Sequence, residues 1–265
     1  MVLKSLKSAL AAKELTIGSW LTLADTDICE IMSQFDFDWL AIDAEHSSIG
    51  LREMSRMIQV IDLAGTVPIV RVGSNNPLLI KYALESGAHG IIVPMINTLE
   101  DAQSAVAAAH YPPRGQRGVG LYRAQSFGTS FEKYKEWCEN EIVVIAQIEH
   151  HIGAKNLHEI MDTDGIDGFL VGPYDLSGSF GKPGNFNDPD VLKSLELIQN
   201  YCKFGKKPGG YHVVHTADEA LKQKIDEGYQ FIAYGTDMIF LTEKLEAERC
   251  RIKKILGEST EDETD

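Results

Sequence analysis

The sequence predicts a single α/β domain with the fold of a TIM (β/α)8 barrel. Short apolar or β-branched runs recur along the 265 residues, and each is followed by a longer stretch with helical periodicity. About eight such pairs can be counted, the number that closes a TIM barrel. The runs are nearly continuous in apolar residues, which is typical of parallel strands buried on both faces. A doubly wound open sheet is the alternative, although no GxGxxG motif follows the first run.

The expected strands, in chain order, are Ile17–Leu21, Trp39–Ile42, Val67–Arg71, Gly90–Pro94, Ile142–Ile148, Gly168–Val171, Gly209–Val213 and Phe231–Tyr234. The expected helices are Thr26–Gln34, Leu51–Leu63, Pro77–Ser86, Thr98–Ala109, Ile152–Met161, Asp188–Phe204 and Thr216–Glu227. Two of them end at Gly87 and Gly228, where a left-handed C-cap costs least. The long connection Tyr111–Tyr134 is expected to form an elaborated loop on one face of the barrel. No linker rich in Pro, Gly or Ser divides the chain, so the barrel should span residues 1–256.

Composition and charge limit the partners of this chain. A formal net charge of −14 argues against nucleic acid, because a binder needs a basic surface to displace counterions from phosphates. Residues 257–265 are expected to form an acidic, disordered tail with no chemical role. The four cysteines lack disulfide or metal-ligand spacing, and no apolar stretch resembles a signal peptide or a membrane span. The sequence therefore predicts a cytoplasmic protein with no nucleic-acid or membrane partner.

Polar side chains follow several expected strands, at the ends where TIM barrels carry their catalytic groups. They are Asp43, Glu45 and His46 after the second strand, Arg71 at the third, Gln147 and Glu149 at the fifth, and Tyr174 and Asp175 after the sixth. Two carboxylates from different strands suffice to hold a hard divalent cation, and the His and Arg would supply a base and an oxyanion stabiliser. Each carboxylate alone would more often be a helix N-cap or a solvated turn residue. Their joint placement favours a site.

Other polar features point less clearly to chemistry. His212 and His215 lie near the end of the seventh expected strand and could rim the same site. The glycine-rich segment Gly178–Lys182 lacks the GxxxxGK[ST] spacing of a phosphate loop. Lys81 and Lys155 fall in expected helices and not at strand ends, so no lysine Schiff base is required.

Five segments carry a resemblance to a known family. They read FDWLAIDAEHSS, PIVRVGSNNPLLIKYALESGAHGIIVPMINTLEDA, YPPRGQRGVG, VVIAQIEHHIGAKNLHEI and GIDGFLVGPYDLSGSFGKPGN. In order, they resemble the signatures of the HpcH/HpaI aldolase family, the metal-dependent class II pyruvate aldolases that include 2-dehydro-3-deoxyglucarate and 4-hydroxy-2-oxoheptanedioate aldolases. The resemblance runs from about Ile17 to about Leu241.

The resemblance implies roles for residues of this sequence. Glu149 and Asp175 match the family's two ligands for a divalent metal ion, Mg²⁺ or a similar ion such as Mn²⁺ or Co²⁺. His46 matches the catalytic base and Arg71 the residue that stabilises the enolate. Gln147 matches a substrate contact.

The resemblance also implies an assembly and shows departures from the family pattern. The family forms homotrimers or homohexamers that often exchange a C-terminal helix, for which Leu241–Leu256 is the matching segment. Glu85 stands where the family has the Asp that pairs with the catalytic histidine. Tyr174 replaces a small residue and is expected to narrow the pocket or hydrogen-bond the substrate. Asp43 and Glu45 are expected to orient His46 and nearby waters.

These inferences predict a lyase that reversibly cleaves a 4-hydroxy-2-oxo acid into pyruvate and an aldehyde through a metal-stabilised pyruvate enolate. His46 would move the proton of the C4 hydroxyl. An alternative uses the same chemistry to decarboxylate a 2-oxo acid or to form a carbon–carbon bond in biosynthesis, and the products distinguish these reactions. A third hypothesis is a binder of 2-oxo acids without turnover.

Overall fold

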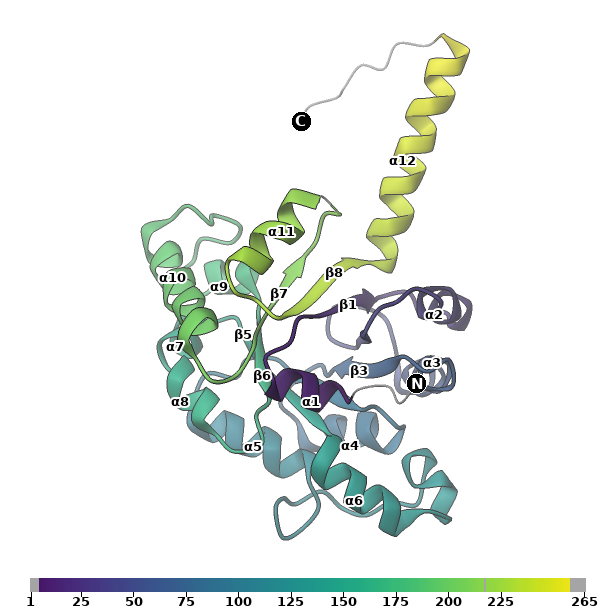
Figure 1. Ribbon diagram of the computed structural model, residues 1–265, viewed down its shortest axis with the longest axis vertical. Coiled ribbons are helices and arrows are strands. Elements are labelled where there is room, and N and C mark those ends of the chain that lie inside the picture. The colour runs from purple at the N-terminus through teal and green to yellow at the C-terminus, as the bar shows by residue number, and fades with distance from the viewer. Residues whose placement is uncertain (1–4, 217, 258–265) are drawn as a thin grey trace.

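The computed structural model describes residues 5–216 and 218–257, and within these ranges eight parallel strands close into one barrel (Figure 1). The strands are β1 (Thr16–Leu21), β2 (Trp39–Asp43), β3 (Val67–Arg71), β4 (Gly90–Val93), β5 (Val143–Ile148), β6 (Gly168–Val171), β7 (Gly209–Val213) and β8 (Phe231–Thr236). Each strand pairs in parallel with the next, and β8 pairs with β1. The predicted TIM barrel is confirmed, and the open-sheet alternative is wrong.

The helices are α1 (Leu6–Ala11), α2 (Thr26–Ser33), α3 (Leu51–Leu63), α4 (Pro77–Glu85), α5 (Leu99–Ala109), the 3-10 helix η1 (Arg123–Gly128), α6 (Phe131–Glu141), α7 (His151–Lys155), α8 (Leu157–Asp162), α9 (Pro173–Gly178), α10 (Pro189–Phe204), α11 (Asp218–Asp226) and α12 (Asp237–Leu256). The predicted helix Ile152–Met161 is interrupted at Asn156, whose side-chain amide donates to the Asn97 carbonyl over 2.9 Å. Helices α1, α6 and α9 were not predicted from the sequence. Among the described helices, none is long and apolar enough to cross a membrane.

The barrel interior is closed at the amino ends of its strands. Trp39 and Phe231 stack there with ring centroids 4.2 Å apart. Gly18 makes room for the indole, because a Cβ on this glycine would lie 2.1 Å from the Trp39 ring. Leu6 and Leu10 of α1 join the same buried cluster. This end of the barrel is therefore filled with apolar side chains, which leaves the carboxyl end as the open one.

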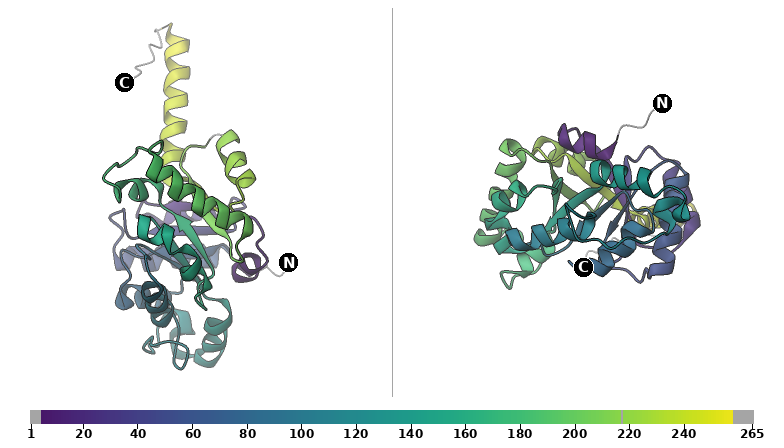
Figure 2. Two further views of the ribbon diagram at one scale, coloured as in Figure 1. Left: turned by 90° about the vertical axis from the view of Figure 1, so that its left-hand side faces the viewer. Right: turned by 90° about the horizontal axis from the view of Figure 1, so that it is seen from below.

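Helix α12 projects beyond the barrel in both upright views (Figures 1 and 2). It begins at Asp237, four residues before the predicted Leu241, because Thr236 caps it by accepting a hydrogen bond from Ile239 N. It ends at Gly257, which adopts the left-handed conformation of a C-cap at φ 72°. The acidic tail was predicted from Gly257 onward, and residues 258–265 lie outside the described part of the chain.

Candidate active site

Near the open end of the barrel, four inward-facing side chains form one layer across the interior. The register of strand pairing places one residue from each odd-numbered strand at this level. These four residues, the site floor, are Trp20 of β1, Arg71 of β3, Gln147 of β5 and His212 of β7. Polar groups at the ends of β2, β5 and β6 surround it.

Asp43, the last residue of β2, holds Arg71 in place. Its carboxylate accepts hydrogen bonds from Arg71 Nη2 at 2.6 Å and from Arg71 Nε at 3.0 Å. The guanidinium also lies over the Trp20 ring, 4.4 Å from its centroid. Burial alone would raise the pKa of Asp43, but the hydrogen bonds and charge of Arg71 outweigh it, so that the pKa lies below its ordinary value. Asp43 therefore stays ionised and holds the positive charge of the Arg71 guanidinium at the site floor.

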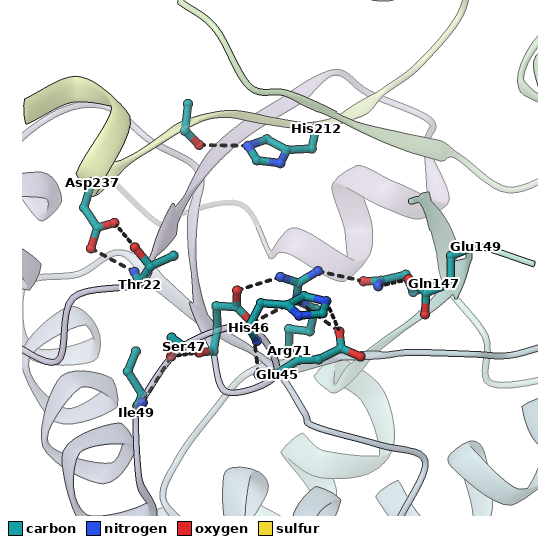
Figure 3. Close-up of polar contacts among 12 residues, drawn as sticks. Thr22, Glu45, His46, Ser47, Ile49, Arg71, Gln147, Glu149, His212 and Asp237 are labelled. Carbon is teal, nitrogen blue, oxygen red and sulfur yellow. Dashed lines mark hydrogen bonds and ion pairs between the residues drawn. The ribbon is translucent and has the colours of Figure 1, made fainter. Parts of the chain in front are cut away.

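The turn after β2 places Glu45 and His46 at the open, carboxyl end of the barrel, here called the mouth. Asp43 Oδ1 accepts hydrogen bonds from the backbone N–H groups of both residues, each at 3.0 Å. His46 Nε2 lies 3.7 Å from Glu45 Oε2, and its side chain is 58% exposed. Figure 3 shows the imidazole beside Arg71 and Glu45. The predicted support of His46 by Asp43 therefore acts through the backbone of the turn, while Glu45 is the neighbour of its ring.

Gln147 and Glu149 continue the site at the end of β5. Gln147 lies between Arg71 and Glu149: its Oε1 is 3.5 Å from Arg71 Nη1, and its Nε2 donates to Glu149 Oε2. The other oxygen of Glu149 accepts a hydrogen bond from Met95 N at 2.8 Å. Burial and the charge of Asp175 raise the pKa of Glu149, although these hydrogen bonds act in the opposite direction. A buried carboxylate is thus held in one orientation (Figure 3).

Asp175 and Tyr174 come from the first turn of α9, just beyond β6. Asp175 is exposed, and its negative charge contributes to the raised pKa of Glu149. The turn passes close to Glu149 at Gly172, where a Cβ would lie 2.9 Å from both Cβ and Oε2 of Glu149. Tyr174 is 62% exposed and packs edge-on against Phe186 at the surface, with centroids 5.0 Å apart.

Three carboxylates near the end of β5 bear on whether a divalent cation could be held here. Within the described residues, no three His, Cys, Asp or Glu side chains gather as metal ligands. The carboxylates that could hold an ion at this end of the barrel are Glu149 and Asp175, whose charges interact. Glu45 Oε2 is buried without a hydrogen-bond partner. Burial and the charge of Glu149 raise the pKa of Glu45 to about 7. A cation beside Glu149 would relieve its repulsion with Glu45 and Asp175. Mg²⁺ is commonly held by one or two carboxylates together with waters and substrate.

Glu85 does not join this site, contrary to the prediction that it pairs with His46. Helix α4 runs back along the barrel after β3, so Glu85, its last residue, lies toward the opposite end from the mouth. Glu85 Oε1 is 3.4 Å from Gln125 Nε2, 3.5 Å from the Tyr111 hydroxyl and 3.9 Å from Arg117 Nε. Within this chain Glu85 therefore supports the long connection between β4 and β5.

Of the four floor residues, Trp20 was not predicted as a site residue, and His212 was expected only as a residue that could rim the site. Trp20, 2% exposed, carries Arg71 on its ring face. His212 meets Trp20 edge-on, with ring centroids 5.9 Å apart. Alternation along β1 and β7 already puts both side chains on an inward face, but only the register of the closed barrel shows that they share a level with Arg71.

Comparisons with known proteins identify the family of this chain. The model of the HpcH/HpaI aldolase/citrate lyase family matches residues 16–243. The chain belongs to the HpcH/HpaI aldolase/citrate lyase family. The resemblance inferred from the five sequence segments is thereby confirmed. The 5-keto-4-deoxy-D-glucarate aldolase of Enterobacter sp. (strain 638) is 36% identical over 233 residues, which are 88% of this chain and 90% of the relative.

Solved structures extend the HpcH/HpaI comparison. An HpcH/HpaI aldolase/citrate lyase family protein from Burkholderia cenocepacia J2315 is 31% identical with a TM-score of 0.86, over 94% of this chain and 98% of that chain. The citrate synthase SbnG is 26% identical with a TM-score of 0.83, over 96% and 99%. The aldolase relatives are the more similar in sequence, so the matches support a metal-dependent aldolase over the bond-forming alternative.

Proposed function

We propose that this member of the HpcH/HpaI family is a class II aldolase that reversibly cleaves a 4-hydroxy-2-oxo acid into pyruvate and an aldehyde. One observation carries the proposal. The buried Glu149, Gln147 and the Asp43-bound Arg71 form a continuous polar chain at the barrel mouth, beside a second carboxylate at Asp175. This set offers ligands for a divalent cation and a fixed positive charge next to it.

Each residue has a role in the proposed reaction. When bound by Glu149 and Asp175, Mg²⁺ or a similar ion supplies a Lewis acid for the 2-oxo acid. Arg71 would face the oxygen on which negative charge develops as the C3–C4 bond breaks. His46, exposed at the mouth beside Glu45, would take the proton of the C4 hydroxyl as the C3–C4 bond breaks, and would return a proton to C3, which completes pyruvate. Gln147 would hold Glu149 in place and contact the substrate.

We further propose a homotrimer or homohexamer that uses α12 at a subunit contact. Five exposed apolar side chains of this helix recur at intervals of three, four and seven residues, so they share one helix face. They are Met238, Leu241, Leu245, Ile252 and Ile255. A cytoplasmic location is proposed as well, since the four cysteines are all unpaired and one of them, Cys250, is exposed.

Exchange of the C3 protons of pyruvate for deuterium tests the core of the proposal, because it needs no knowledge of the aldehyde. We expect exchange with Mg²⁺ present, loss of exchange with a chelator, and loss in Glu149→Gln. The matched control is Glu159→Gln on the exposed face of α8, which should exchange like the wild type. Exchange that survives both chelator and Glu149→Gln contradicts the proposal.

A screen of 4-hydroxy-2-oxo acids, with products read by mass, separates the proposed cleavage from its alternative. Pyruvate with an aldehyde is the expected pair. Carbon dioxide as the product would instead support a decarboxylase.

A further inference from the structure

The fourth position of the site floor has no role in the reaction proposed above. Arg71 and Gln147 face the reacting groups, and Trp20 supports Arg71. His212 completes the floor on β7, and its ring is half-buried. Figure 3 shows this ring across the mouth from Arg71 and Gln147.

The backbone fixes the tautomer of His212. Its Nε2 lies 3.2 Å from the Gly235 carbonyl oxygen. A carbonyl oxygen only accepts, so Nε2 must carry the hydrogen. Gly235 can present this carbonyl because it adopts φ +61° where the pairing of β1 with β8 shifts register. The same oxygen lies 3.4 Å from the Ser19 hydroxyl. The irregularity in β8 therefore sets which ring nitrogen of His212 is protonated.

The other ring nitrogen, Nδ1, is then a hydrogen-bond acceptor without a partner. No described residue pairs with it, and it is not among the polar atoms that the protein encloses. Burial, assisted by the charge of Arg71, lowers the pKa of His212 to about 4, so the ring is neutral near pH 7. A neutral acceptor of this kind selects a donor such as a hydroxyl, and disfavours a carboxylate or keto oxygen.

We infer that His212 is a specificity-determining residue, whose Nδ1 accepts a hydrogen bond from a hydroxyl group on the aldehyde portion of the substrate. The inference rests on the proposed aldolase function. The 2-oxo acid portion is assigned to the side of Arg71, Gln147 and Glu149, so the aldehyde portion is left to the β7 side of the mouth. There Nδ1 is the acceptor that the site floor offers.

A pair of aldehydes that differ by one hydroxyl tests this contact. Pyruvate is added to glycolaldehyde or to acetaldehyde, and the preference is the ratio of the two kcat/KM values. Wild type should prefer glycolaldehyde. His212→Phe keeps a ring against Trp20 but removes the acceptor, and should lower the ratio at least about tenfold. His212→Asn keeps a neutral acceptor and should retain part of the preference. His215→Phe is the matched control, since His215 is 81% exposed beyond β7, and should leave the ratio unchanged.

Deuterium exchange into pyruvate, measured on the same variants, separates the two proposals. Exchange retained in His212→Phe with an unchanged ratio overturns the role of His212 and leaves the aldolase function standing. Equal losses for both aldehydes, together with lost exchange, would mean that His212 only supports Trp20 and Arg71, which also overturns it. Wild-type protein that neither exchanges pyruvate nor joins it to either aldehyde overturns both proposals.

Discussion

At the residue scale, the site depends on how Arg71 is held. Two hydrogen bonds to Asp43, the face of Trp20 and the amide of Gln147 fix its guanidinium in one position. A planar fork with several donors can satisfy all three neighbours at once, whereas the ammonium of lysine is a point charge that cannot. The position of the charge, and not only its sign, is therefore specific to arginine.

Arg71→Lys should lower kcat roughly 100-fold, the effect of removing one oriented donor of about 2.7 kcal/mol from an oxyanion site. Pyruvate release in steady state measures it. Arg251→Lys, on the exposed part of α12, is the control and should keep wild-type kcat. A nearly unchanged kcat in Arg71→Lys would show that a positive charge alone suffices and that the oriented donors of the guanidinium are not needed.

Asp43→Asn tests the same ion pair through acid stability. Because the pKa of Asp43 is depressed in the folded protein, its ionised form stabilises the fold above the ordinary pKa of an aspartate, and this contribution is lost as the pH falls toward the depressed value. The variant should be less stable than wild type at pH 7, and the difference should shrink on acidification. Urea midpoints between pH 7 and pH 3 measure it. Asp36→Asn, at an exposed position, should show no such convergence.

At the element scale, the turn from β6 into α9 positions Asp175 relative to Glu149. A methyl group at Gly172 would meet the Glu149 side chain, whereas a Cβ at Gly178, later in α9, has nothing within 4 Å. We expect Gly172→Ala to weaken Mg²⁺ binding about 10- to 100-fold, as loss of outer support does at metal sites. Titration calorimetry with pyruvate present measures it. Gly178→Ala should bind like wild type, and equal affinities in both variants would place the ion elsewhere.

Helix α12 permits a second test at this scale. Leu241→Glu combined with Leu245→Glu puts charge on the exposed apolar face, where burial against a partner would be costly. The oligomer should dissociate, and light scattering measures its mass. Ala247→Glu with Lys254→Glu changes the opposite, exposed face and should leave the mass unchanged. An unaltered mass in both variants would exclude this face of α12 from the subunit contact.

At the scale of the whole molecule, the sequence predicted the barrel and most of its mouth, because both depend on patterns along the chain. Asp43, Arg71, Gln147 and Glu149 each stand at a strand end, and parallel strands bring those ends to one edge. The role of Glu85 was predicted wrongly within this chain, since a helix end returns to the far side of the barrel.

The floor residue His212 and helix α1 mark the limit of such prediction. His212 shares a level with Arg71 only through the register accumulated around eight strands, which alternation within one strand does not specify. Leu6 and Leu10 of α1 have the i, i+4 spacing of a helix face, but the short segment gives no sign of the partner that it covers.

The two ends of the barrel should accordingly respond differently to mutation. Leu10 is fully buried with Trp39 and Phe231 at the end away from the site, and Lys7 of the same helix pairs with Asp167 at 2.9 Å. Leu10→Ala should lower the free energy of unfolding by about 2 to 5 kcal/mol, the usual cost of such a cavity. The kcat of the folded protein should not change, because the site floor rests on side chains farther along the strands.

Chemical denaturation and steady-state kinetics on the same preparation test this separation of stability from function. Leu15→Ala, at a position 45% exposed, is the control and should change neither quantity much. If kcat falls in Leu10→Ala as much as in Arg71→Lys, then a packing defect at the closed end disturbs the site at the other end of the barrel. If kcat is unchanged while stability falls, α1 acts as a structural closure, and the chemistry depends on the carboxyl ends of the strands alone.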